Sequence, residues 1–421
     1  MVEILKKIIE LKEKYSAKVG DIQYFYDDGR ACVFHWAEEL GEPLYLDILK
    51  NLNARQYGDY IIFKYLKNEV IFSREDISYS TFWNLYDGVY RDCRGITIDV
   101  KNECLVTRPF SKFFNINEMP ETQENIIKEK YAKARRAEFS EKLDGSLIIT
   151  RYYNNDIYVS SSGMADDDNI VVKFAKKIIN NDCNYSNLIK DYSDYTLMFE
   201  SISLNDTHIV VYTPDEQGLY LVGMRNVETG EYVMYSDLIK IAHKYNVKTT
   251  SKYDVDLDGI AALRKKFKAS EKEGFVLNID NFLLKLKCDD YILLHRVAGT
   301  NCSKNNIVKA VYYDSIDDVR ANVPKEYLPV LEDTLRNIYH YCSLMEEAEN
   351  KYFNSAPLMD RVKFFTWLKK VPSYLQRYLS YRYIYGKSMS YLVSRESNSQ
   401  PSFYKYEEIL KITEKLEASR E

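Results

Sequence analysis

The sequence predicts an α+β fold in which antiparallel sheets with flanking helices precede an all-helical C-terminal part. First, neighbouring strand-like segments are joined by turns too short for the crossovers that parallel strands need. Second, amphipathic helical periods separate these hairpins. Third, strand patterns end near residue 303, and only helical periods follow. A chain of 421 residues exceeds one ordinary domain, so we predict two domains, spanning 1–300 and 301–421.

The elements of the first domain are predicted in order from hydrophobic period and turn residues. Residues 1–15 form a helix with Ile4, Leu5, Ile8 and Leu11 on one face, and 22–110 are mostly β. Strands are joined into hairpins at 95–107, 146–162, 219–233 and 274–287, and a single strand covers 197–202. Helices follow Asp166–Asp168 as far as Ile179 and cover 236–245 and 257–269.

The second domain is predicted to consist of helices near 324–350, 358–370, 373–385 and 404–418, with turns at Pro357, Pro372 and Pro401. Within it, residues 374–387 interleave tyrosine with arginine. Such a surface suits an RNA stem or loop. The same period also fits a buried helix face, which we favour.

Composition excludes several classes of protein. The net charge of −5 excludes a surface that is positive throughout, so a nucleic-acid site must be a local patch. The 38 tyrosines pack a core or stack on bases, and packing is the more common use. The scattered cysteines and histidines disfavour disulfides and zinc. Without a signal peptide or a membrane-length apolar run, we expect a soluble, cytoplasmic protein.

The run Glu141-Lys142-Leu143-Asp144-Gly145-Ser146 is the most informative motif. A lysine amine can attack the α-phosphate of a nucleoside triphosphate and carry the nucleotide covalently. The glycine allows phosphate and backbone to approach closely because it has no Cβ. Taken alone, the motif also fits a surface hairpin with a solvated lysine.

Two other patterns suggest a charged site. Lys285 and Lys287 share one face of a strand whose other face carries leucines, and a triphosphate between the lysines would relieve their repulsion. A solvent-facing hairpin edge is the alternative. Glu200 lies in an apolar strand and needs a partner, which a metal ion, a ribose hydroxyl or a structural cation would supply. Arg94 and Lys112 add cations that can bind phosphate.

Together the charged residues form an ordered series that resembles the covalent nucleotidyltransferase superfamily of ATP-dependent ligases and mRNA capping enzymes. In sequence order, the series is Arg94, Lys112, Lys142, Glu200, Glu273, Lys285 and Lys287. Within it the chain resembles the phage-type RNA ligase 1 family along most of residues 20–320. The segments that carry the resemblance are Cys93–Ile96, Arg108–Asn115, Lys142–Leu147, Phe199–Glu200, Glu228–Tyr232, Glu273–Val276 and Lys285–Tyr291. An N-terminal nucleotidyltransferase (adenylation) domain is therefore expected.

The resemblance implies roles for individual residues. Lys142 would be the adenylated nucleophile, and Lys285 and Lys287 would contact the α-phosphate. Other implied nucleotide contacts are Tyr65, Arg94, Lys112, Phe114, Asp144, Gly145 and Glu200. Glu273 and Asp317 would place magnesium, for which manganese can substitute. The pattern departs from the family at Ser162, where such ligases often carry a lysine before the glycine, so one phosphate-binding cation is missing or replaced.

The implied activity is ATP-dependent ligation of RNA. Nearby cations and a metal are expected to depress the pKa of Lys142, freeing its amine to attack ATP. AMP then moves to an RNA 5′-phosphate, and a 3′-hydroxyl displaces it. The resemblance further implies a phage-like or viral enzyme, in the host cytoplasm if viral. We expect it to act as a monomer on nicked tRNA, with an end-healing kinase or phosphatase as partner.

Two alternatives remain. One is a GTP-dependent capping guanylyltransferase, against which the helical tail argues, and the other is an inactive RNA-binding relative. For the tail, we expect Arg377→Ala and Arg382→Ala to weaken tRNA sealing without affecting self-adenylation.

Overall fold

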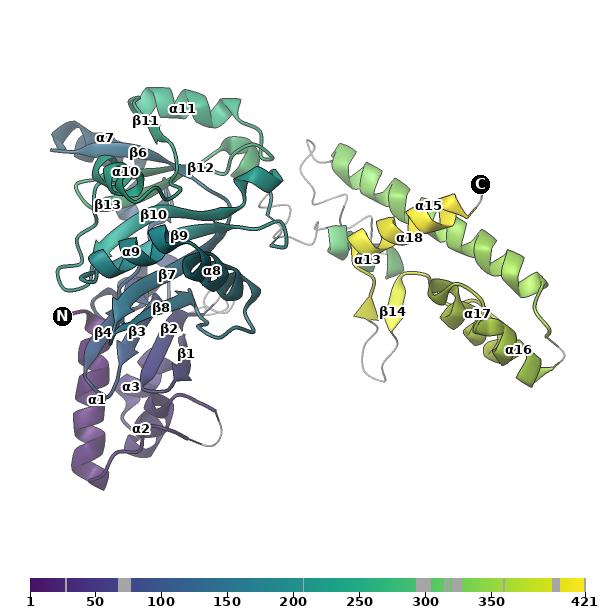
Figure 1. The fold of residues 1–421 in the computed structure, drawn as a ribbon, viewed down its shortest axis with the longest axis horizontal. Coiled ribbons are helices and arrows are strands. Elements are labelled where there is room, and N and C mark those ends of the chain that lie inside the picture. Colours follow the sequence, from purple (N-terminus) through teal and green to yellow (C-terminus); the bar gives the residue numbers. More distant parts are fainter. Residues whose placement is uncertain are drawn as a thin grey trace. The chain divides into compact units, whose positions relative to one another are not determined.

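The computed structural model describes residues 1–26, 29–66, 77–206, 208–292, 304–313, 316, 319, 328–358, 360–395 and 402–419. The chain divides into two compact units, Met1–Ile292 and Leu293–Glu421 (Figure 1). The α+β class is confirmed, because the described strands of the first unit pair antiparallel except at β13 and β5. No described helix has both the length and the apolar content needed to cross a membrane.

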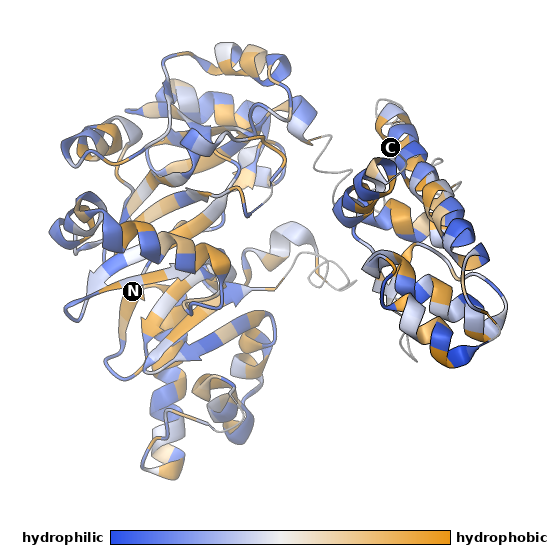
Figure 2. Ribbon diagram, turned by 45° about the vertical axis from the view of Figure 1, so that its right-hand side comes forward, coloured by the Kyte–Doolittle hydropathy of each residue, from blue (hydrophilic) through white to orange (hydrophobic). Residues whose placement is uncertain are grey.

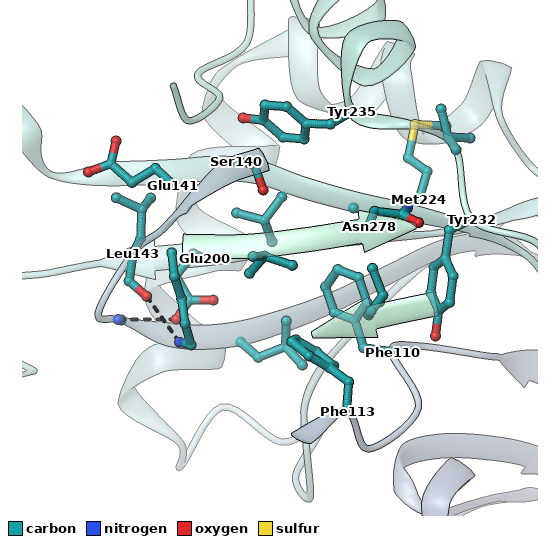
Figure 3. Close-up of a pocket in the computed structure, with 18 of the residues that line it drawn as sticks. Phe110, Phe113, Ser140, Glu141, Leu143, Glu200, Met224, Tyr232, Tyr235 and Asn278 are labelled. Carbon is teal, nitrogen blue, oxygen red and sulfur yellow. Dashed lines mark hydrogen bonds between the residues drawn. The ribbon is translucent and has the colours of Figure 1, made fainter. Parts of the chain in front are cut away.

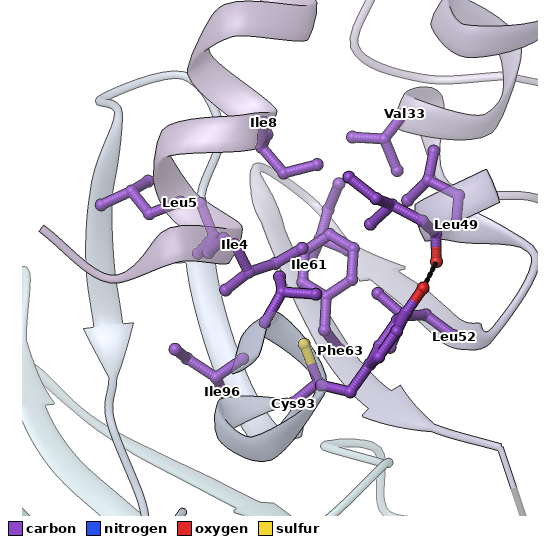
Figure 4. Packing of buried hydrophobic residues seen from close by; sticks show 14 of the residues in the cluster. Ile4, Leu5, Ile8, Val33, Leu49, Leu52, Ile61, Phe63, Cys93 and Ile96 are labelled. Carbon is purple, nitrogen blue, oxygen red and sulfur yellow. Dashed lines mark hydrogen bonds between the residues drawn. The ribbon is translucent and has the colours of Figure 1, made fainter. Parts of the chain in front are cut away.

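The first sheet has the order β1-β2-β3-β4 and is covered by N-terminal helices. Helix α1 (Glu3–Val19) buries Ile4, Leu5, Ile8 and Leu11 as predicted, and Figure 4 shows this face packed on residues of β1, β2 and β3. The strands are β1 (Leu52–Tyr57), β2 (Tyr60–Tyr65), β3 (Arg94–Asp99) and β4 (Cys104–Thr107). The last two form the predicted hairpin.

The expectation that residues 22–110 are mostly β was wrong. Helices occupy much of this range, namely α2 (Cys32–Leu40), α3 (Pro43–Leu49), α5 (Tyr79–Phe82), η1 (Leu85–Gly88) and α6 (Val89–Asp92). Here residues with strand propensity form the buried face of a helix instead. In α2, for example, Val33, Trp36 and Ala37 are buried at helical spacing. Pro43 begins α3, in the first turn, where backbone N–H groups have no intrahelical partner to lose.

The second sheet has the order β10-β9-β7-β8. Its strands are β7 (Ser146–Tyr153), β8 (Asp156–Ser161), β9 (Tyr195–Ile202) and β10 (Gly218–Asn226), and its helices are α8 (Ile170–Asn181), α9 (Cys183–Asp191) and α10 (Tyr235–Lys244). The predicted 219–233 hairpin forms only in part, because its second arm contributes just an isolated bridge from Tyr232 to Arg225.

The third sheet, ordered β11-β6-β12-β13-β5, joins segments far apart in the sequence. Its strands are β5 (Phe114–Asn115), β6 (Ala137–Lys142), β11 (Lys252–Tyr253), β12 (Gly274–Ile279) and β13 (Phe282–Lys287). Flanking elements are η2 (Pro120–Thr122), α7 (Glu124–Lys133), η3 (Pro214–Glu216) and α11 (Leu257–Lys266). The predicted β12–β13 hairpin turns at Asp280 and Asn281, both at positive φ.

The second unit contains α13 (Lys304–Tyr312), α15 (Leu328–Asn354), α16 (Arg361–Leu368), α17 (Ser373–Tyr385) and α18 (Tyr406–Ala418). Its helices alternate hydrophobic and hydrophilic residues, and the hydrophobic ones form a separate core (Figure 2). The all-helical expectation was incomplete, because β14 (Val393–Arg395) and β15 (Ser402–Phe403) form a short antiparallel ribbon. Such short segments carry too little alternation for a sequence pattern to detect.

Candidate active site

Lys142 is the last residue of β6. It belongs to a row of paired residues that crosses the third sheet. Gly274 of β12 pairs with Lys142 on one side and with Lys287 of β13 on the other, so both lysines flank a residue without a side chain. Gly274 has φ +154°, and a Cβ there would lie 2.5 Å from the carbonyl oxygen of Leu286. The row therefore requires glycine.

The carboxylate of Glu273 bridges the two lysines. Its Oε2 lies 2.6 Å from Lys142 Nζ, and its Oε1 lies 3.0 Å from Lys287 Nζ. Burial raises the pKa of this carboxyl, but the two ammonium groups outweigh burial and hold the pKa below its usual value. The pKa of Lys142 is lowered by burial and raised more strongly by Glu273 and Glu200, so it ends above its ordinary value. The expectation that the pKa of Lys142 is depressed was wrong for this ligand-free arrangement, because the charges nearest to its amine are carboxylates.

Glu200 lies on β9 beside the turn that follows Lys142. The backbone N–H of Gly145 donates to its Oε1 at 3.1 Å. A Cβ on Gly145 would lie 2.6 Å from the carbonyl oxygen of Ser201 and 2.9 Å from Glu200 Cγ, so this glycine makes room for β9. Burial raises the pKa of Glu200 to about 7, and the Glu273 charge adds to the rise while Lys142 opposes it.

A cavity of about 320 Å³ opens beside Lys142 (Figure 3). Arg94, Lys142, Gly145, Ser162 and Glu200 are among the residues that line it. Its other wall is aromatic and apolar, made by Phe110, Phe113, Met224 and Tyr232. Sequence reasoning missed this wall. Phe113 and Tyr232 lie inside the motifs that carry the resemblance, but a sequence does not show whether an aromatic ring faces a core or a cavity.

The cations beside this cavity are suited to an anion. The guanidinium of Arg94 and the ammonium of Lys285 lie 5.6 and 4.7 Å from the ring centre of Phe113. Arg94 Nη1 is buried and has no hydrogen-bond partner in the described part of the chain. Burial lowers the pKa of Lys285 well below its usual value, and Arg94, Lys112, Lys142 and Lys287 lower it further. A polyphosphate would relieve this concentration of positive charge.

Six of the predicted nucleotide contacts lie outside the lining of this cavity, namely Tyr65, Lys112, Phe114, Asp144, Lys285 and Lys287. The ammonium of Lys112 sits 5.3 Å from the ring of Tyr65, 4.9 Å from Trp83 and 5.6 Å from Phe114. Tyr65 and Phe114 thus surround Lys112, and Phe114 belongs to the N-terminal core. Lys112 itself faces a neighbouring cavity of about 370 Å³ that shares Phe113 and Tyr232 with the first.

Asp144 also turns away from the cavity. Its Oδ2 accepts the backbone N–H groups of Ile209 and Val210 at 2.9 and 3.1 Å, and its Oδ1 accepts the Tyr291 hydroxyl at 3.0 Å. The structure therefore gives Asp144 an anchoring role behind the Lys142 turn. The predicted metal residue Asp317 lies outside the described residues.

At the unusual Ser162, a cation approaches from another strand. A Cβ on Gly163 would lie 3.2 Å from Lys64 Cδ and 3.9 Å from Lys64 Nζ. Lys64 of β2 pairs with Arg94 of β3, and Ser162 and Arg94 both line the cavity.

A divalent metal fits here only together with phosphate. No group of three or more His, Cys, Asp or Glu side chains suited to a metal occurs among the described residues. Mg²⁺ commonly takes one or two carboxylates and completes its shell with phosphate oxygens and water. Glu200 and Glu273 can supply those carboxylates, although lysines now occupy both oxygens of Glu273.

Comparison with known proteins finds likenesses to RNA ligases. Residues 92–293 match a family model described as RNA ligase. A provisionally named bifunctional polynucleotide kinase/RNA ligase of Autographa californica nuclear polyhedrosis virus is 28% identical over 249 residues, which are 55% of this chain and 35% of that protein. This chain thus spans about a third of the viral relative. A provisionally named RNA ligase of Thermovibrio ammonificans is 26% identical, over 62% of this chain and 68% of its own length.

Solved structures give weaker likenesses. An archaeal ATP-dependent RNA ligase has a TM-score of 0.41 at 11% identity, covering 72% of this chain and 78% of that one. A lysine-to-alanine variant of the Naegleria gruberi RNA ligase, solved with ATP and Mn, has a TM-score of 0.34 at 17% identity, covering 41% and 56%.

Proposed function

We propose that this chain, whose residues 92–293 match a family model described as RNA ligase, is an ATP-dependent RNA ligase that joins 5′-phosphate and 3′-hydroxyl ends. One observation carries the proposal. Lys142 and Arg94 line one cavity, and Arg94 Nη1 is buried there without a described partner. Lys285, which lies against the cavity residue Phe113, is crowded by cations. A nucleotide triphosphate supplies both the missing negative charge and the electrophile for a lysine amine.

The first step forms a bond between Lys142 Nζ and the α-phosphorus of ATP and breaks the bond to pyrophosphate. Lys142 must lose a proton, and Glu273 Oε2 at 2.6 Å is within reach to accept it. Arg94, Lys112 and Lys285 would neutralise the departing pyrophosphate. Magnesium, or manganese in its place, would add positive charge on the phosphates, held through Glu200 and Glu273.

Two further transfers complete the reaction. A 5′-phosphate oxygen of RNA attacks the lysyl-AMP, which breaks the N–P bond and returns the amine. An RNA 3′-hydroxyl then attacks the 5′-phosphorus, forms the phosphodiester and releases AMP. Because the viral relative's name joins a kinase to a ligase, we propose that a kinase or phosphatase prepares the ends for this chain as well.

Nicked tRNA is the substrate that we propose. The resemblance supports it, and so does the second unit, where Arg361, Lys363, Lys369 and Lys370 are all exposed at or just beyond α16.

A covalent-labelling experiment tests the chemistry. The protein is incubated with magnesium and α-labelled ATP or GTP and then run on a denaturing gel. We expect label from ATP, none from GTP, and none in Lys142→Ala. Label from GTP alone would favour a capping enzyme, and no label in the native chain would favour a binding protein.

A further inference from the structure

We propose that Ser140 and Asn278 read the edge of the nucleotide base and thereby select adenine over guanine. This inference rests on the proposed function. It concerns the part of the cavity where Figure 3 places both side chains between Tyr235 and Phe110.

The position of the two residues follows from strand register. Side chains two apart on a strand share a face, so Lys142, Ser140 and Glu138 line one face of β6. Asn278 of β12 pairs with Glu138, and Val276 pairs with Ser140. At about 3.3 Å per residue, Ser140 and Asn278 lie roughly 7 and 13 Å along the sheet from Lys142. A nucleotide bonded to Lys142 through phosphate places its ribose next and its base at this distance.

The surrounding wall is suited to a base. Phe110 and Tyr232 stack with ring centres 5.6 Å apart, and Phe113 meets Phe110 edge-on at 5.7 Å. Aromatic rings offer stacking to any base, so they bind without choosing. Selection requires polar groups that are free to bond.

Most polar side chains in this part of the cavity are already bonded. Glu138 accepts from the backbone N–H and hydroxyl of Ser236 at 3.0 and 2.6 Å. Tyr232 accepts the Ser111 N–H at 3.0 Å, and the Tyr235 hydroxyl bonds to Thr250.

Two polar side chains in this part of the cavity each keep an atom without a hydrogen-bond partner among the described residues. Ser140 and Asn278 line the cavity and are only 9% and 7% exposed, yet among the described residues nothing bonds to Ser140 Oγ or Asn278 Nδ2. The orientation of the Asn278 amide is fixed, because its Oδ1 accepts the backbone N–H of Asn281 at 2.9 Å. Nδ2 is therefore the end of this cavity-lining amide that is left to donate to a ligand.

The donor pattern favours adenine. Adenine presents an acceptor at N1 beside the donor 6-amino group, which match the Asn278 donor and the Ser140 hydroxyl oxygen. Guanine presents N1–H at the same place, so two donors would oppose each other and Asn278 would lose its partner. A site built to bond one base rejects another chiefly through buried groups left unpaired.

The test measures kcat/KM for lysyl-nucleotide formation with ATP, GTP and a purine ribonucleoside triphosphate that lacks the 6-amino group. Ser140→Ala should lower the value for ATP about five- to tenfold and leave the value for the analogue unchanged. Asn278→Asp keeps the bond to Asn281 and replaces the donor with an acceptor, so it should lower the ATP-to-GTP ratio more than tenfold. Ser160→Ala removes a buried hydroxyl outside the cavity and should change none of these values.

The outcomes separate the two proposals. If the native chain forms no lysyl-AMP, the proposed function fails. If the native chain forms lysyl-AMP but Ser140→Ala slows ATP and the analogue equally, or Asn278→Asp leaves the ratio unchanged, base reading is overturned and the ligase proposal stands.

Discussion

The side chain of Glu200 makes the stability of the folded chain depend on pH. Its pKa in the folded protein is about 7 against an ordinary 4.5, chiefly because it is buried. Between these values the folded chain binds more protons at this carboxyl than the unfolded chain does. The stabilisation from Glu200 is therefore complete below pH 4.5 and is lost as the pH rises through 7.

Glu200→Gln should remove this dependence, because an amide is neutral at every pH. Above pH 7 the unfolding free energy of the ligand-free variant should exceed that of the native chain by about 3 kcal/mol, and near pH 4.5 the two should converge. Chemical denaturation at both pH values measures this. A constant difference across the range would contradict the assigned pKa. Self-adenylation should fall in the variant despite its higher stability, since the carboxylate that we propose helps to hold the metal is lost.

At the level of strands, a lysine of β2 approaches Ser162, the position where such ligases often carry a lysine. Strand β2 carries Lys64 to Gly163, which has no side chain to exclude it. β3 begins with Arg94 directly opposite Lys64. A cation from a strand almost a hundred residues earlier thus lies close to the position that lacks one.

Lys64→Ala should therefore raise the KM for ATP, or slow transfer of AMP to RNA, by about tenfold. Adding Ser162→Lys in the same chain should restore the loss, because residue 162 lines the same cavity. Steady-state kinetics of each step provides the measurement, and Lys101→Ala, in the exposed turn at the far end of β3, is the matched control. Absence of both the loss and the rescue would show that Lys64 does not contact substrate.

At the scale of the whole molecule, the arginines of α17 are structural. Arg382 lies 3.7 Å from the fully buried Glu349, donates to Asn350 at 2.6 Å and lies 4.4 Å from the ring of Phe353. Arg377 reaches the carbonyl of Val393 at 3.5 Å. The expected selective effect of replacing these two arginines therefore loses its basis, because alanine would disturb the helical unit itself.

The exposed cations at α16 are a better test of tRNA binding. Replacing Arg361, Lys363, Lys369 and Lys370 by serine should weaken sealing of nicked tRNA about tenfold or more at low salt, since affinity falls with every phosphate that the protein no longer neutralises. Self-adenylation should not change. Lys411→Ser with Lys415→Ser, exposed on α18, is the control. Equal loss of sealing in the control pair would mean that general charge, and not this site, attracts RNA.

The sequence by itself determined three of the four predicted hairpins, because their polar turns and alternating residues act locally. It also singled out the charged motifs, because Lys142, Glu200, Glu273 and the lysine pair stand out against apolar strands. It misjudged residues 22–110, where aromatic and branched residues serve helix faces.

Only the tertiary structure decided which charges meet. Glu273 pairs with Lys142 across 131 positions, which reverses the pKa expected for the lysine. Asp144 faces backbone amides, Tyr65 and Phe114 surround Lys112, and Ser140 and Asn278 face the cavity. Side-chain period fixes a face of a strand, but the register between distant strands fixes what that face contacts, and no local pattern encodes that register.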